Sequence, residues 1–108
     1  MSVSRAWLLI GIAGLLEVAW AMGLKYSEGF TRPWVSGFTL VTMAASMWLL
    51  AQGLKVLPAG TGYAVWTGIG AVGTAILGIV LLGESRSGLR LLCIGLIVAG
   101  IVGLRVAD

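Results

Sequence analysis

The sequence has no histidine, a single cysteine and only four acidic residues. Without histidine it cannot form a Ser-His-Asp triad or a Cys-His pair, and an ordinary zinc cluster is also excluded. The lone Cys93 has no intrachain partner for a disulfide and lies in an apolar run, where we interpret it as a packing residue. We therefore expect neither an enzyme nor a protein that holds a metal or a cofactor.

Charge is also scarce. Charged residues make up 10% of the 108 residues and hydrophobic residues 59%, whereas a soluble domain has roughly 25% charged residues. This composition predicts an integral membrane protein that has the lipid bilayer as its surroundings. The net charge of +3 is spread over loops and ends, so we expect no basic patch for nucleic acid.

Four apolar runs occupy most of the chain, at about residues 6–24, 34–54, 60–82 and 89–106. Each has roughly the 17–25 residues that a helix needs to cross a bilayer. The first run is too long for the core of a signal peptide, and three more follow it, so we expect it to remain in the mature protein. The fold class predicted is all-α and integral to the membrane, with residues 1–108 forming a single domain of four short transmembrane helices.

The basic residues are almost evenly divided between the two sides of this predicted arrangement. One side holds Arg5, Lys55 and Arg105, and the other holds Lys25, Arg32, Arg86 and Arg90. An excess of Lys and Arg on one side normally orients a membrane protein. Either orientation is set by other means, or the chain inserts both ways. Because four short helices enclose little space, we favour an antiparallel, dual-topology homodimer.

Glu17 is the one acidic residue inside an apolar run. A carboxylate at the bilayer centre costs on the order of 2.5–3.5 kcal/mol even on insertion scales. One interpretation is a neutral acid that is hydrogen-bonded to a neighbouring helix. The other, which we favour, is a site that binds protons and cations, because apolar surroundings disfavour the charged form of a carboxyl group.

The second run has a hydroxyl at three positions on one helical face, Thr39, Thr42 and Ser46. Such residues often bond to carbonyls of their own helix or pack against another helix. For the two threonines, this alternative and a functional role are equally open. Ser46 lies mid-span, as Glu17 does, and is the best candidate to bond the carboxylate.

The third run begins with two aromatic residues and continues with glycines. Tyr63 and Trp66 are three residues apart and share a helical face. They belong either to an interfacial aromatic belt or to the wall of a cation site, with hydroxyl, indole N–H and ring faces as contacts. Gly68 and Gly70 indicate either a flexible point in the helix or close helix packing.

Two motifs connect this chain to a known family. Residues 17–26 read EVAWAMGLKY and residues 58–70 read PAGTGYAVWTGIG. With these motifs the chain resembles the small multidrug resistance (SMR) family of proton-coupled exporters over essentially its whole length. Within that family it is similar to the guanidinium exporter branch, the Gdx or SugE type. The polyaromatic-drug branch usually has Gly-Thr in place of Trp20-Ala21, and a tyrosine in the second span that this chain lacks. Gly62 departs from the alanine that is common before Tyr63.

The resemblance implies a multi-pass protein of the bacterial inner membrane that exports guanidinium, and small guanidinyl compounds, in exchange for protons. It implies an antiparallel homodimer in which both copies of Glu17 share one site. The positions that match those holding or surrounding the carboxylates are Trp20, Ser46, Tyr63 and Trp66, with the Gly14 backbone beside them.

Two other functions stay open at this point. The first is a broader exporter of quaternary ammonium compounds from the same family. The second is a non-transporting accessory protein or one half of a heterodimer. Balanced loop charge argues against a heterodimer, because its halves ought to be biased in opposite directions.

Overall fold

The computed structural model describes residues 1–107, and over these residues the chain forms four helices joined by short loops. These are α1 (Val3–Tyr26), α2 (Pro33–Gly53), α3 (Ala59–Leu82) and α4 (Gly88–Ala107). Each is long and apolar enough to cross a membrane. The prediction of four membrane helices is thus confirmed, with ends that differ from the predicted ones by three residues at most.

Local sequence explains where the helices begin and end. The Ser2 hydroxyl caps α1 by accepting a backbone N–H of the first turn at 3.1 Å. Pro33 occupies the first turn of α2, where its missing N–H costs nothing. Gly83 ends α3 in the left-handed conformation, at φ +66°, which a residue without Cβ adopts freely.

The α1–α2 loop is a tight turn built on Ser27, which is fully buried. Its hydroxyl donates to the carbonyl of Leu24 at 2.8 Å and accepts the N–H of Phe30 at 3.1 Å. Glu28, Gly29 and Phe30 all have positive φ. The buried side chain thus anchors a left-handed turn that returns the chain toward α2.

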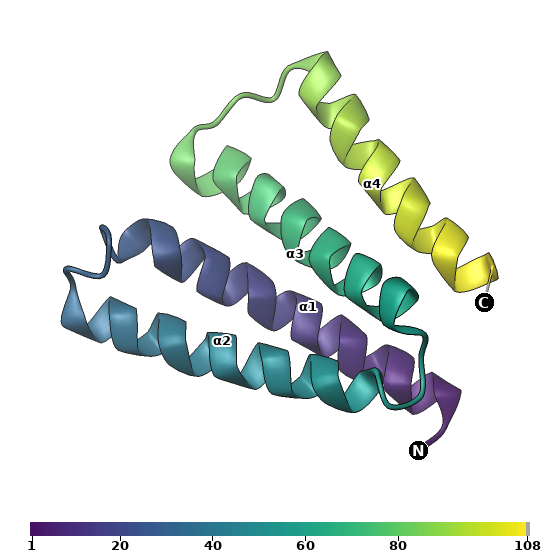
Figure 1. The fold of residues 1–108 in the computed structure, drawn as a ribbon. Coiled ribbons are helices and arrows are strands. Elements are labelled where there is room, and N and C mark those ends of the chain that lie inside the picture. The colour runs from purple at the N-terminus through teal and green to yellow at the C-terminus, as the bar shows by residue number, and fades with distance from the viewer. Residues whose placement is uncertain (108) are drawn as a thin grey trace.

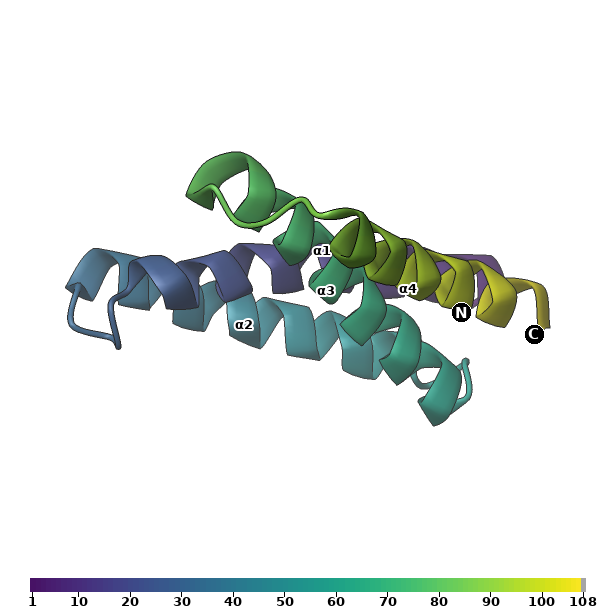
Figure 2. The same ribbon diagram turned by 90° about the horizontal axis from the view of Figure 1, so that it is seen from above.

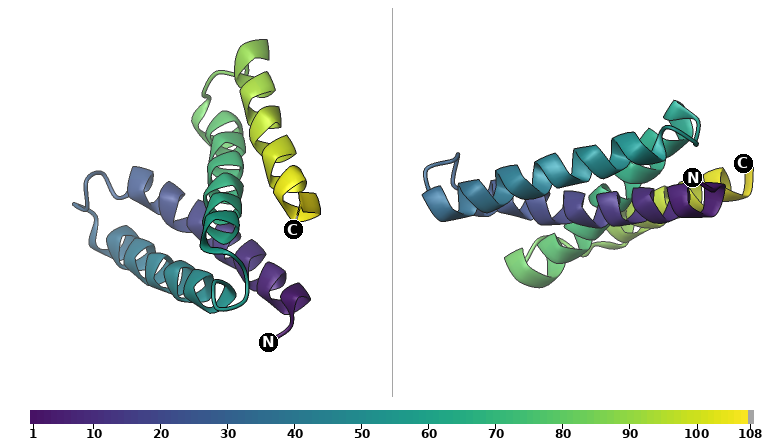
Figure 3. Two further views of the ribbon diagram at one scale, coloured as in Figure 1. Left: turned by 45° about the vertical axis from the view of Figure 1, so that its right-hand side comes forward. Right: turned by 90° about the horizontal axis from the view of Figure 1, so that it is seen from below.

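The helices form an open layer rather than a closed bundle. The described chain measures 39 × 35 × 16 Å. α1 packs against α2 on one side and crosses α3 on the other, while the backbone of α4 approaches only α3 among the helices of residues 1–107 (Figures 1 and 2). In Figure 3 (left), α3 and α4 lie side by side and cross the α1–α2 pair. The start of α1, the end of α4 and the α2–α3 loop lie at the same end of the layer (Figure 1).

The core lies where α1, α2 and the first half of α3 meet. Its buried side chains are Ala6, Ile10, Ala13, Leu50, Leu57, Val65 and Trp66. No residue of α4 is buried in the single chain. Its C-terminal end reaches α1, where the Arg105 guanidinium lies 4.7 Å from the ring centre of Trp7. Most of α4 therefore presents apolar side chains to lipid or to another protein surface.

Candidate functional site

Glu17 lies where α1 crosses α3, and its side chain is half-buried. It occupies space left by Gly70 of α3, because a Cβ there would lie 2.6 Å from Glu17 Cγ and would collide with the carboxyl group. Glu17 Oε1 is buried and has no hydrogen-bond partner among residues 1–107. An unpaired buried acceptor is costly, so this oxygen is available to a donor that comes from outside the chain.

Gly14 brings the two helices together one turn earlier on α1. A Cβ at Gly14 would lie 2.7 Å from Ile69 Cβ. α1 and α3 therefore approach closely at two glycines, Gly14 on α1 and Gly70 on α3. This packing presses Glu17 against the backbone of α3 and limits the conformations of its side chain.

Ser46 and Trp66 hold the turn of α1 from which Glu17 projects. The Trp66 indole N–H donates to Ser46 Oγ at 3.0 Å, and Ser46 Oγ donates to the carbonyl of Ala13 at 2.7 Å. In an α-helix, the carbonyl of residue 13 also accepts the N–H of residue 17. The structure thus joins Ser46 to the α1 backbone one turn before Glu17. The hydrogen bond from Ser46 to the Glu17 carboxylate, which the sequence predicts, is not present in the described chain.

The other two predicted aromatic residues differ in their surroundings. Trp20 is one turn beyond Glu17 on α1, and its Nε1 is buried without a hydrogen-bond partner within residues 1–107. Tyr63 is 57% exposed, and its ring lies against that of Trp66 with centroids 5.5 Å apart. Trp66 is only 6% exposed. The structure therefore brings Trp66 into the helix core and leaves Tyr63 at its surface.

The two threonines of α2 bond within their own helix. Thr39 Oγ1 donates to the carbonyl of Val35, and Thr42 Oγ1 donates to that of Phe38, each at 2.8 Å. Thr39 is fully buried where its hydroxyl touches Gly23 of α1. These contacts favour the packing alternative for both residues.

Gly68 and Gly70 of α3 each face a neighbouring helix. A Cβ at Gly68 would lie 2.9 Å from Ile101 Cδ1 of α4, whereas Gly70 faces Glu17 of α1. α3 is a continuous helix through both positions. Close packing accounts for both glycines, and a role in bending the helix stays a prediction.

One residue of the site was missed from the sequence. Thr74 follows Gly70 by one helical turn, and its Oγ1 is buried without a hydrogen-bond partner within the described chain. The spacing Gly70, Thr74, Gly78 could have indicated one polar, narrow face of α3, since residues four apart share a face.

The arrangement offers an anionic acceptor and indole groups in an apolar crossing, which suits the binding of a small cation or a proton. Within residues 1–107, no group of three or more potential metal ligands comes together.

Comparison with known proteins is consistent with this chemistry. The chain matches the family model described as Small Multidrug Resistance protein over residues 5–97. It is 70% identical over 103 residues to a protein of Yersinia pseudotuberculosis named guanidinium exporter, covering 95% of this chain and 99% of the relative. Proteins with the same name from Salmonella typhimurium and Citrobacter freundii are 60% and 59% identical over 102 residues, covering 94% of this chain and 97% of each relative.

Proposed function

The chain belongs to the small multidrug resistance family, and from that membership we propose that it exports guanidinium ions, and small guanidinyl compounds, in exchange for protons. It is a multi-pass protein of the bacterial cytoplasmic membrane. The active form that we propose is an antiparallel homodimer, in which the two copies of Glu17 form one site.

The observation that carries this proposal is the position of Glu17. It is the one acidic side chain inside the four helices of residues 1–107, and it has a buried oxygen with no internal partner. Charged groups at this depth are rare and usually belong to an ion or proton pathway. An acid kept only for structure would be expected to have its oxygens paired inside the chain.

Guanidinium suits a carboxylate pair. The ion is planar and permanently charged, with N–H groups around its edge, and carboxylates bind such a shape through two parallel hydrogen bonds. One ion between two copies of Glu17 would satisfy both. The names of the relatives, at 59–70% identity over nearly the whole chain, support this substrate.

Proton coupling follows if the two glutamates hold either protons or the cation, but not both. Two carboxyl groups then release up to two protons for each cation bound. In an antiparallel dimer of identical chains, exchange of conformations between the two subunits gives inward- and outward-facing states of equal energy. Alternating access therefore needs no separate energy source beyond the gradients themselves.

The open layer supports assembly from two copies. The described chain forms a layer only 16 Å thick, and α4 has no buried residue, so one copy leaves a broad apolar face uncovered. A second copy in the opposite orientation supplies the missing walls. Transporters commonly obtain the same symmetry from inverted repeats within one chain.

The test is proton release from the detergent-solubilised protein when guanidinium chloride is added. The wild type should release protons, and Glu17→Gln should release none while remaining dimeric by light scattering. Glu28→Gln, which removes an exposed loop carboxylate, is the control and should behave as wild type. Proton release by the Glu17→Gln protein would contradict the assignment of the site.

A broader exporter of hydrophobic cations is the second candidate. The family description favours it, as does an apolar cavity of about 480 Å³ between α1 and α2, lined by Met22, Val35 and Phe38 among others. Currents in proteoliposomes distinguish the two. A response to tetraphenylphosphonium and none to guanidinium would reverse the ranking, and no response to either cation would indicate an accessory protein.

A further inference from the structure

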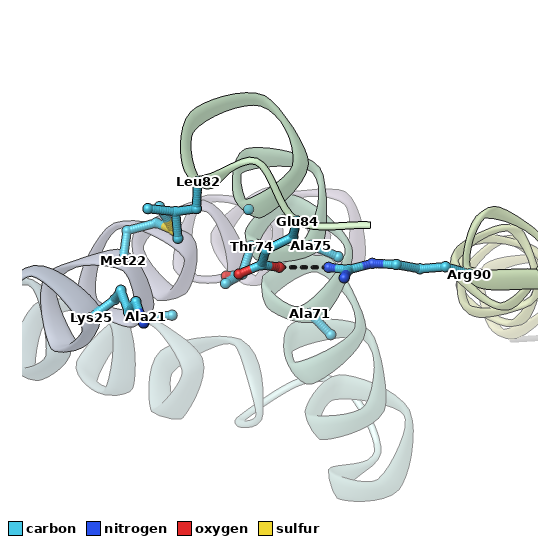
Figure 4. A pocket seen from close by; sticks show the side chains of 10 residues that line it. Ala21, Met22, Lys25, Ala71, Thr74, Ala75, Leu82, Glu84 and Arg90 are labelled. Atoms are coloured by element: carbon cyan, nitrogen blue, oxygen red, sulfur yellow. Dashed lines mark hydrogen bonds and ion pairs between the residues drawn. The ribbon is translucent and has the colours of Figure 1, made fainter. Parts of the chain in front are cut away.

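A second cavity lies beyond Glu17, toward the end of the layer that holds the α1–α2 and α3–α4 loops. It has a volume of about 340 Å³ and is lined on the α1 side by Ala21 and Lys25 and on the α3 side by Thr74 and Gly78. Glu84 and Arg90 also line it, and Figure 4 shows them joined by an ion pair. Ala21 follows Glu17 by one helical turn, so the cavity is the next space along the crossing of α1 and α3.

The backbone holds Glu84 over this cavity. Gly83 turns the chain back at the end of α3, and the Glu84 N–H donates to the carbonyl of Gly78 at 3.1 Å. A Cβ at Gly78 would lie 2.7 Å from the carboxyl carbon of Glu84. Two glycines therefore let the carboxylate fold onto the last turns of α3 instead of extending into water.

The partner of this carboxylate is itself a guanidinium group. Arg90 Nη2 donates to Glu84 Oε1 at 2.7 Å, from the first turn of α4, and the two side chains are 31% and 41% exposed (Figure 4). A free guanidinium ion in the place of the Arg90 side-chain group could make the same contact with the Glu84 carboxylate. Because both groups are partly exposed, water and salt weaken the pair, so a soluble ion can compete with it.

Thr74 lies between the two carboxylates along α3. Glu17 lies over Gly70, and Glu84 lies over Gly78. These positions are eight residues apart, or about 12 Å along a helix. Thr74 is midway, and its buried Oγ1 has no partner within residues 1–107. It can accept an N–H from a cation that moves between the two acids.

We propose that Glu84 and Thr74 form an outer guanidinium site, through which the ion travels to and from Glu17, and that Arg90 is a tethered competitor for that site. The proposal rests on the proposed function and adds a second binding position to it. Lys25 on the opposite wall contributes a further positive charge. The outer site therefore binds weakly and releases its ion readily, as a transfer position must.

Transport kinetics in proteoliposomes provide the first test. Glu84→Gln should raise the KM for guanidinium by up to about 5-fold, the range of an exposed ion pair. Arg90→Gln should lower the KM by a similar factor, because the competitor is gone. In the Glu84→Gln background, the Arg90 substitution should have no further effect. Thr74→Val should raise the KM.

Matched controls exist on the same side of the protein. Glu28→Gln and Arg86→Gln remove the same charges from loop residues that do not line the cavity, and both should leave the KM unchanged. If Glu84→Gln and Arg90→Gln shift the KM in the same direction, or leave it unchanged, the pair is only a structural contact and the proposal is wrong.

A binding measurement separates this proposal from the function of Glu17. In the Glu17→Gln protein, the side-chain ¹⁵Nε resonance of Arg90 is followed while guanidinium chloride is added, with sodium chloride at equal ionic strength as the reference. Arg90→Lys assigns the resonance. A saturable shift with guanidinium, absent after Glu84→Gln, supports the outer site whether or not Glu17 couples protons. No difference from sodium chloride would overturn the outer site and leave Glu17 untouched.

Discussion

Replacing Gly70 with alanine should impair ion binding at Glu17, although Glu17 itself is unchanged. The added Cβ would lie 2.6 Å from Glu17 Cγ and closer still to the carboxyl group. Non-bonded carbon atoms prefer about 3.5–4.0 Å, so the Glu17 side chain must move by about 1 Å or more. A binding site tolerates a displacement of its groups by only about 0.5 Å from the productive geometry.

The energetic consequence falls on binding more than on folding. Overpacking costs about 1–3 kcal/mol, and alanine returns about 1 kcal/mol of helix propensity relative to glycine. The free energy of unfolding should therefore fall by less than about 2 kcal/mol. Displacement of the carboxylate should weaken guanidinium binding by at least about 10-fold, which corresponds to about 1.4 kcal/mol.

The measurement is proton release as a function of guanidinium concentration, with melting temperature recorded in the same detergent. Gly68→Ala is the matched control, because its Cβ would meet side chains of α4 and not Glu17, with Ile101 Cδ1 at 2.9 Å and Ile97 Cγ2 at 3.5 Å. Gly68→Ala should keep the wild-type midpoint. A wild-type midpoint for Gly70→Ala, or equal losses in the two variants, would refute the reasoning.

Three further predictions concern stability and topology. Ser46→Ala leaves the buried Trp66 N–H without its acceptor, so the free energy of unfolding should fall by about 1–3 kcal/mol; Thr42→Ala, which loses bonds only within its own helix, should change it little in the same denaturation assay. Gly83→Ala places a side chain at φ +66° and should cost about 1–2 kcal/mol, measured the same way. A C-terminal tag should be accessible from both faces of the membrane in intact cells and spheroplasts, and labelling from one face alone would rule out antiparallel insertion.

The helices were predictable because hydrocarbon imposes a strict length and composition on them. All four predicted runs became helices, with Ser2 capping α1, Pro33 in the first turn of α2 and Gly83 ending α3. Glu17 could also be singled out from one sequence, since a lone acid in an apolar run is expensive, and its role in ion binding stays a prediction. These are local properties of the chain, which need no knowledge of how the helices pack.

The partners of the site residues were not predictable in the same way. Ser46 was expected to meet the carboxylate, but its hydroxyl bonds the carbonyl of Ala13 and the indole of Trp66. The position of Ser46 along α2 brings it level with the Ala13 carbonyl of α1, but the angular position of α2 around α1 decides which atom the hydroxyl meets. That angle depends on the packing of three helices at once, and no periodicity in one helix encodes it.

Gly70 illustrates the same limit. Its sequence context indicates either a flexible point in α3 or close helix packing. Neither interpretation identifies the group that lies opposite the glycine. The structure places a carboxyl group there. The absence of a side chain on one helix is meaningful only when the group opposite it on another helix is known.

The attachment of the fourth helix has a consequence for variants. Since the α4 backbone approaches only α3 in the described chain, a replacement in the middle of α4 can reach the acidic residue only by first disturbing its neighbour. In the proposed dimer the same replacement would alter the contact between the two copies directly, so its defect should appear as weaker assembly before it appears as altered ion binding.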